Sequence, residues 1–192
     1  MKAITRVLMA TGLMVTATAA SAHAGHDAGT GFASGLLHPM LGLDHLLAMA
    51  AIGFWSVRQS ATLKNSTPLF VIGGMILGAG IAWGGVSLPG VETGIALSVL
   101  LAGILIATMA KLPTAVGGTL VAAFMVFHGF AHGTEMPAGA SLVAYLAGFS
   151  IATLALTFVG RGLGALMQKT DIRFGRVLGG VVAAIGALLA GA

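Results

Sequence analysis

The chain has 192 residues, of which 57% are hydrophobic and only 7% are charged, whereas about a quarter of the residues of a soluble domain are charged. This composition excludes an ordinary soluble protein and favours a membrane protein. The formal net charge of +4 comes from basic residues that are too few and too scattered for a nucleic-acid surface. There are no cysteines, so disulfides, iron–sulfur clusters and thiolate metal sites are excluded.

Residues 1–22 have the pattern of a secretory signal peptide. Lys2 and Arg6 supply a positive n-region, and the apolar stretch behind them is too short to span a bilayer. Residues 20–22, Ala-Ser-Ala, match the small-x-small pattern that precedes a cleavage site. We therefore expect the mature chain to begin on the outer side of the membrane.

The next segment, residues 23–30, is polar and glycine-rich, and we expect a mobile tail on the outer face. Its side chains His23, His26 and Asp27 could capture a divalent metal weakly. The competing interpretation is a solvated tail whose histidines are incidental.

Six apolar runs follow, and each is near the ~20 residues that cross ~30 Å of hydrocarbon as a helix. Proline, glycine or charged residues separate them, and the longest separator is 161–176. We predict an all-α fold, a polytopic bundle of six transmembrane helices, within a single domain at 31–192. The predicted spans are residues 31–57, 67–88, 90–110, 113–134, 137–160 and 174–192.

The basic residues indicate the orientation of these spans. With the N-terminus outside, every connection that carries lysine or arginine falls on the inner side, as the positive-inside rule requires. These residues are Arg58, Lys64, Lys111, Arg161, Lys169, Arg173 and Arg176. The outer segments hold only the acidic residues Asp27, Glu92 and Glu135. We therefore expect a multi-pass protein of a bacterial inner membrane.

Glycines recur four residues apart within the spans, as small-xxx-small pairs that let helix backbones approach closely. Dimers use the same device, but we expect these pairs to pack helices of one chain. The pairs are Gly74/Gly78, Gly80/Gly84 and Gly175/Gly179.

The first span contains polar groups where lipid would be expected. His38, Asp44 and His45 lie within it, although an acidic side chain at the bilayer centre costs about 2.5–3.5 kcal/mol on insertion scales. On one helix the two imidazoles share a face, about 10.5 Å apart. Pro39 should kink the helix or start it.

The fourth span carries a second polar set. His128 and His132 are four residues apart and Glu135 follows three later, so all three share one helical stripe. The first span runs inward and the fourth outward, which places both sets at a similar depth. We therefore predict that the two spans bring these side chains together with His38, Asp44 and His45 to hold a metal ion.

Imidazole and carboxylate ligands suit nickel, cobalt, zinc or copper, whereas magnesium prefers oxygen ligands alone. Met49 and Met125 lie one helical turn from a histidine, so a thioether contribution is conceivable. Buried methionines more often fill gaps in packing, and both interpretations stay open.

The eight residues HPMLGLDH, from His38 to His45, resemble the HPxxGxDH signature of the HupE/UreJ proteins. Residues 127–135, FHGFAHGTE, resemble the second block of that family, FHGxAHGxE. The resemblance covers the whole mature chain and implies a secondary permease for nickel, in some members cobalt, that supplies the maturation of hydrogenase or urease. It also implies that His38, Asp44 and His45 are needed for transport, with the second set as their partners.

The leading hypothesis is a metal-uptake permease, not an enzyme, with no permanently bound cofactor. The chain lacks a GxxxxGK[ST] loop, so ATP hydrolysis is not expected. The first three and last three spans would form an inverted pair, as in many carriers. The alternatives are an intramembrane zinc hydrolase, with Asp44 or Glu135 as general base, and a haem-binding electron-transfer protein.

Overall fold

The computed structural model describes residues 31–191, and in this part of the chain every regular element is an α-helix. The predicted signal peptide, residues 1–22, and the predicted outer segment with His23, His26 and Asp27 lie outside the described residues. The helices are α2 (Gly31–Leu41), α3 (Leu43–Ser56), α4 (Ala61–Trp83), α5 (Val91–Thr108), α6 (Thr114–Thr134), α7 (Leu142–Met167) and α8 (Ile172–Ala190).

Five of the helices are each long and apolar enough to cross a membrane. The first predicted span is instead a bent pair, α2 and α3, whose axes differ by 79° across a short break. Counted as one broken span, this pair brings the total to six. The all-helical membrane fold is thus confirmed, with five to six spans by length and composition.

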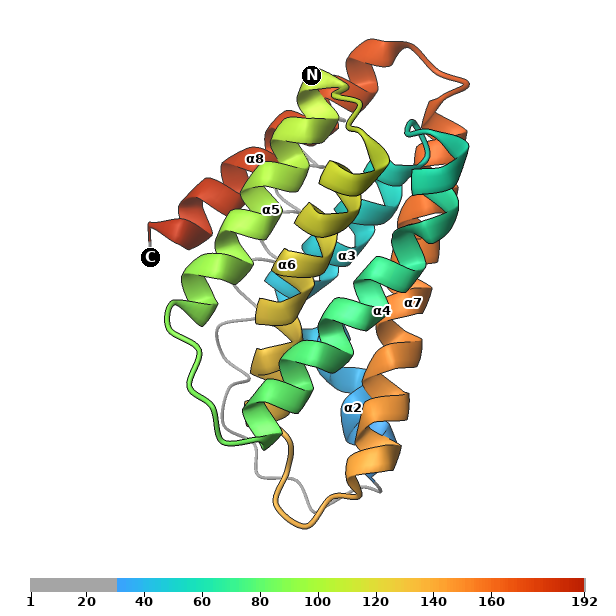
Figure 1. Ribbon diagram of the computed structural model, residues 1–192. Helices are drawn as coiled ribbons and strands as arrows, with labels where there is room; N and C mark the ends of the chain where they lie inside the picture. The colour runs from blue at the N-terminus through green and yellow to red at the C-terminus, as the bar shows by residue number, and fades with distance from the viewer. Residues whose placement is uncertain (1–30, 192) are drawn as a thin grey trace, which may run out of the picture.

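The helices pack in three principal pairs (Figure 1). α4 crosses α6, α5 lies along α8, and the bent pair α2 and α3 lies against α7. Exchanging the first half, α2 to α5, with the second half, α6 to α8, maps the α4–α6 pair onto the pair of α7 with α2 and α3. The same exchange leaves the α5–α8 pair unchanged. This correspondence supports the inverted arrangement of the two halves.

Glycines make the same close approach in both equivalent pairs. A Cβ on Gly129 would lie 2.0 Å from the Met75 carbonyl oxygen, and a Cβ on Gly78 would lie 2.0 Å from that of Val126. Gly53 and Gly160 repeat this reciprocal pattern between α3 and α7, again with oxygens at 2.0 Å. Each glycine faces the carbonyl three residues before its partner glycine, so the backbones touch and any side chain would separate them.

The predicted glycine pairs have different outcomes. Gly74 and Gly78 pack against α6, and Gly179 packs against the backbone of α5, so intrachain packing is confirmed there. A Cβ on Gly80 would meet nothing within 4 Å, and one on Gly84 would meet only carbonyls of its own helix. These two glycines therefore pack no helices together within the described chain.

Two predicted spans have wrong boundaries. α4 begins at Ala61, before Pro68, because Ser60 caps it by accepting from the Leu63 amide. A proline cannot donate to the carbonyl four residues earlier, and here the Arg161 guanidinium donates to that carbonyl, on Lys64, at 2.8 Å. Arg161 is in turn part of α7, which runs on to Met167. The predicted separator 161–176 is therefore mostly helix.

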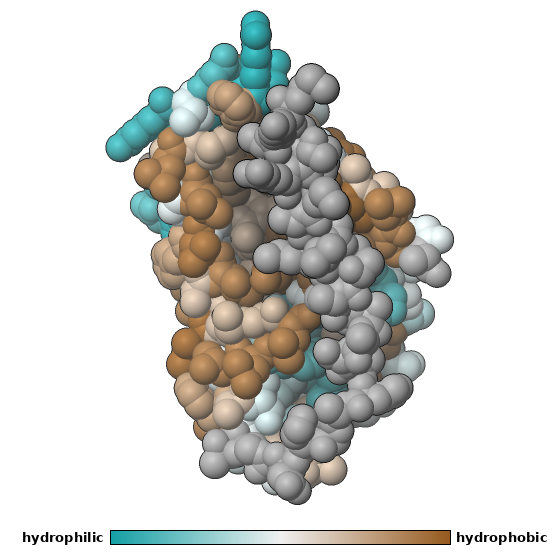
Figure 2. Space-filling model, turned by 180° about the vertical axis from the view of Figure 1, so that it is seen from behind, coloured by the Kyte–Doolittle hydropathy of each residue, from teal (hydrophilic) through white to brown (hydrophobic). Residues whose placement is uncertain are grey.

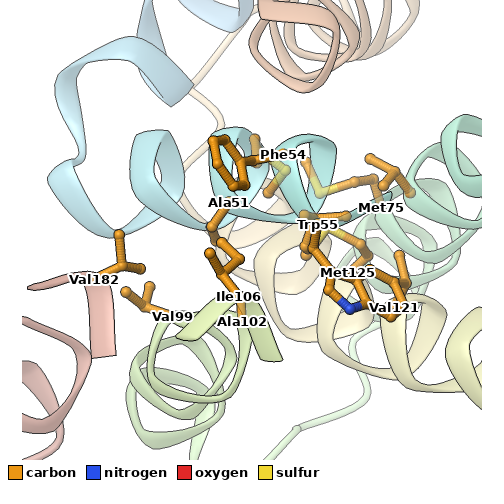
Figure 3. Packing of buried hydrophobic residues seen from close by; sticks show 14 of the residues in the cluster. Ala51, Phe54, Trp55, Met75, Val99, Ala102, Ile106, Val121, Met125 and Val182 are labelled. Atoms are coloured by element: carbon orange, nitrogen blue, oxygen red, sulfur yellow. The ribbon is translucent and has the colours of Figure 1, made fainter. Parts of the chain in front are cut away.

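The hydrophobic core joins the helix pairs at mid-bundle. Trp55, Met125 and Val121 lie together, and Val99 of α5 faces Val182 of α8 (Figure 3). Around this core, large apolar side chains remain exposed on the outer faces of the helices. Figure 2 shows such apolar side chains over much of one face, with the most prominent hydrophilic ones projecting from one end.

The two ends of the bundle differ in charge. The turns α3–α4, α5–α6 and α7–α8 lie at one end (Figure 1), and all the basic residues predicted to be cytoplasmic lie in or near them. We call this the basic end. The opposite end, with Glu92 and Glu135, is called the acidic end.

Candidate metal site

The site is built around the break in the first span. Pro39 lies inside α2, and the chain bends at Gly42, whose extended backbone (φ −84°, ψ 117°) starts α3. The prediction that Pro39 would kink or start the helix is thus wrong by three residues. A Cβ at Gly42 would lie 2.9 Å from Asp44 Oδ1, so glycine leaves room for this carboxylate to fold back over the bend.

The bend brings the histidines into one cluster. The ring centroids of His38 and His45 are 6.5 Å apart, closer than the two straight helical turns that we predicted. His45 contacts His128 at 4.6 Å and His132 at 4.7 Å, and His38 contacts His132 at 4.9 Å. The two antiparallel spans therefore meet at a common depth through their imidazoles.

Each carboxylate of the predicted set holds one of these imidazoles. His45 Nδ1 donates to Asp44 Oδ1 at 2.9 Å, and the same oxygen accepts from the His45 amide at 2.6 Å. His38 Nε2 donates to Glu135 Oε2 at 2.5 Å. This hydrogen bond holds the pKa of the Glu135 carboxyl below its ordinary value, although partial burial opposes the shift. Such carboxylate–histidine pairs fix the ring that binds a metal.

Several imidazole nitrogens are buried without a hydrogen-bond partner among residues 31–191. They are His45 Nε2, His128 Nδ1 and both nitrogens of His132. His128 and His132 are fully buried, and His132 stacks on Phe149 with the ring centroids 5.1 Å apart. Buried polar atoms are nearly always satisfied, so this cluster has unused capacity for hydrogen bonds or metal ligation.

A cavity of about 220 Å³ lies beside the cluster and is lined by His38, Asp44, His45 and Glu135. Glu92, expected from the sequence only as an acidic residue of an outer segment, also lines this cavity. The available signal was its position in the first turn of α5, at the end of the bundle to which Glu135 also belongs. Three carboxylates therefore border the cavity beside the imidazoles.

The structure brings together all six predicted ligands, but not as a closed coordination sphere. Within the described chain, no three His, Asp or Glu side chains are placed so that they could hold a metal ion. The imidazoles contact each other edge to face, with interplanar angles of 63° to 88° among the closest three pairs. Their rings must rotate before their nitrogens can converge on one ion, whose Zn–N bonds, for example, are about 2.0–2.1 Å.

Fold and site together define a polytopic membrane protein with a histidine–carboxylate cluster between a broken helix and α6. The HupE / UreJ protein family model matches residues 11–189. The chain is also 43% identical over 175 residues to Protein HupE of Rhizobium leguminosarum bv. viciae, covering 88% of this chain and 89% of that protein. The chain therefore belongs to the HupE/UreJ family, a transporter-type family generally related to nickel and cobalt transport. No solved structure matches it.

Proposed function

We propose that this protein is a secondary permease that takes up nickel or cobalt through the cluster of His38, Asp44, His45, His128, His132 and Glu135. The observation that supports this most strongly is the set of buried imidazole nitrogens without partners, beside a cavity bordered by carboxylates. Neutral imidazole with a few carboxylates is a donor set for nickel, cobalt, zinc or copper. Family membership favours nickel or cobalt among these metals.

The geometry suggests a path for the ion. Glu92 and Glu135 attract the hydrated cation to the acidic end, and the cavity admits it to His38 and Asp44. There it exchanges water molecules for imidazole nitrogens as the rings of His45, His128 and His132 turn toward it. An open cluster binds less tightly than a preformed tetrahedral cage, which suits a carrier because the ion must leave again.

Release requires the opposite end to open. The two inverted halves, α2 to α5 and α6 to α8, could rock against one another around the cluster, as inverted repeats do in other carriers. We propose that the basic end faces the cytoplasm of a bacterium, following the positive-inside rule. The ion delivered there would serve the maturation of hydrogenase or urease.

The test is uptake of radioactive nickel and cobalt by cells that express the protein. His38→Ala, Asp44→Ala and His128→Ala should each abolish uptake while the amount of protein in the membrane stays unchanged. Arg176→Gln, at the exposed start of α8, is the control and should leave uptake intact. Unchanged uptake in all three site variants would contradict the proposal.

The same preparation separates this proposal from a zinc hydrolase. A permease should bind nickel or cobalt reversibly. Loss of uptake after an uncoupler removes the proton-motive force would identify a driven carrier, and unchanged uptake would identify a passive facilitator. A purified protein that instead retains one zinc ion through dialysis and cleaves a peptide or lipid would support the hydrolase.

A further inference from the structure

Ser98 of α5 makes two short hydrogen bonds, one with a carbonyl of its own helix and one with His128. Ser98 is buried, and its Oγ lies 2.6 Å from the carbonyl oxygen of Ile95 and 2.8 Å from His128 Nε2. A carbonyl oxygen carries no proton, so two oxygens this close need the hydroxyl proton between them. The hydroxyl therefore donates to Ile95 and has only lone pairs to offer His128.

This arrangement determines the tautomer of His128. Because Ser98 Oγ can only accept, His128 Nε2 must carry the proton that forms their hydrogen bond. The other nitrogen, Nδ1, is then the one with the free lone pair, and it is fully buried without a partner in the described structure. The centroid of the His128 ring lies 4.6 Å from that of His45, so the ring that carries this lone pair is part of the imidazole cluster.

Ser98 thus plays the same part for His128 as the two carboxylates play for His38 and His45. Asp44 accepts from His45 and Glu135 accepts from His38, and each leaves the second nitrogen of its imidazole free. Ser98 does the same for His128 from a third helix, with a neutral oxygen. Ser98 belongs to neither of the two sequence motifs, because it lies on α5. A neutral acceptor also orients the ring without adding a negative charge where the ion must leave again.

We propose that Ser98 is a positioning residue of the metal pathway, which presents His128 Nδ1 to the ion by accepting a hydrogen bond from Nε2. This inference rests on the proposed function, since it assigns the metal-facing nitrogen of one ligand. Outer partners of this kind typically change metal affinity by about 10- to 100-fold. For a neutral partner we expect the lower end, about 10-fold.

The first test measures the tautomer directly and needs no transport. In protein labelled with ¹⁵N-histidine, the His128 signal, identified by its loss in His128→Gln, should report a proton on Nε2 in a hydrogen bond. Ser98→Ala should remove the signature of that hydrogen bond. A wild-type His128 with its proton on Nδ1 would overturn the inference, whatever the protein transports.

The second test measures nickel affinity by titrating the purified protein and by the nickel dependence of uptake. Ser98→Ala should weaken binding and raise the half-saturating nickel concentration about 10-fold, with little change in the maximal rate. Ser98→Thr keeps the hydroxyl and should restore wild-type values, because a small cavity beside residue 98 leaves room for the methyl group.

Ser56→Ala is the matched control for loss of a buried serine. Ser56 is also fully buried and donates to the carbonyl three residues earlier, at 2.7 Å, but within residues 31–191 its hydroxyl bonds no histidine. It should leave nickel affinity unchanged. Equal loss in Ser56→Ala and Ser98→Ala, or no loss in Ser98→Ala, would reject the positioning role. Absence of nickel uptake by the wild-type protein would instead reject the proposed function.

Discussion

The two ends of the bundle treat their buried polar groups in opposite ways. At the basic end, Gln59 donates to the Ala110 carbonyl at 3.0 Å and accepts from the Leu112 amide at 3.0 Å. Trp55 donates to the same carbonyl at 3.0 Å, and Arg161 satisfies the carbonyl that Pro68 leaves free. These contacts tie the α3–α4 connection to the α5–α6 connection and α7 to α4, so these polar groups are satisfied within the protein.

Toward the acidic end, a broken helix and a cavity surround imidazoles whose nitrogens have no partner in the described chain. Leaving a buried polar atom unpaired costs about 1–3 kcal/mol, so a bundle selected for stability alone would not collect four such nitrogens. The difference between the ends shows that satisfied and unsatisfied buried polar groups are separated along the bundle axis. The polar groups of the basic end stabilise the fold, whereas the imidazole cluster keeps unused hydrogen-bonding capacity, as the proposed binding of an ion requires.

The largest effect should come from removing a charge at the cluster. Asp44→Asn keeps the shape of the side chain but weakens its hold on the His45 ring, and we expect nickel uptake to fall about 10- to 100-fold. Asp171→Asn is the matched control, because Asp171 caps α8 at the basic end by accepting from the Arg173 amide. Asparagine is an equally good cap, so uptake should not change. Equal losses in both variants would break the comparison.

The largest effect on stability should follow from separating α3 and α7. Gly160→Ala places a methyl group 2.0 Å from the Ala50 carbonyl oxygen, and we expect the free energy of unfolding to fall by about 3 kcal/mol. Gly162→Ala, on the same helix, meets nothing within 4 Å and should cost nothing. Thermal unfolding in detergent measures both. Similar melting temperatures for the two variants would contradict the tight glycine contact.

The contrast between the ends predicts changes of opposite sign for two polar-to-apolar substitutions. His132→Leu removes two unpartnered buried nitrogens, so the free energy of unfolding should rise by about 1–2 kcal/mol even though a proposed ligand is removed. Gln59→Leu removes satisfied hydrogen bonds, so that free energy should fall by about 1–2 kcal/mol. Chemical denaturation of both purified variants gives the sign. A destabilised His132→Leu variant would mean that the imidazole already has a structural partner.

The smallest effect is expected at Met49, which is fully buried one turn beyond His45. If its thioether only fills space, Met49→Leu should change the free energy of unfolding by less than about 1.5 kcal/mol and leave nickel uptake as it is. Uptake at several nickel concentrations provides the measurement. A marked rise in the half-saturating concentration would show that sulfur takes part in binding, the interpretation that the sequence left open.

Much of this protein follows from the order of its residues. Apolar runs of membrane-spanning length predicted an all-helical bundle, because a backbone in lipid must satisfy its own hydrogen bonds. The two His-rich motifs predicted that the first and fourth spans meet, and the contacts of His45 with His128 and His132 place them together. The chain reverses direction after every span, so successive connections lie at opposite ends of the bundle. The sequence alone therefore assigned the basic connections to one end and the acidic connections to the other.

Only the tertiary structure decided the details that depend on neighbours distant in sequence. The break falls at Gly42 and not at Pro39, because a helix can absorb a missing amide donor but the returning Asp44 carboxylate needs a residue without a Cβ. Helix α7 continues through Arg161 because that side chain finds a carbonyl on another helix. Ser98 and Glu92 reach the cluster from α5 by packing alone. Local sequence patterns reveal helix periodicity and the energetic cost of polar side chains in a membrane. The positions of these residues are set instead by contacts between helices that are distant in sequence.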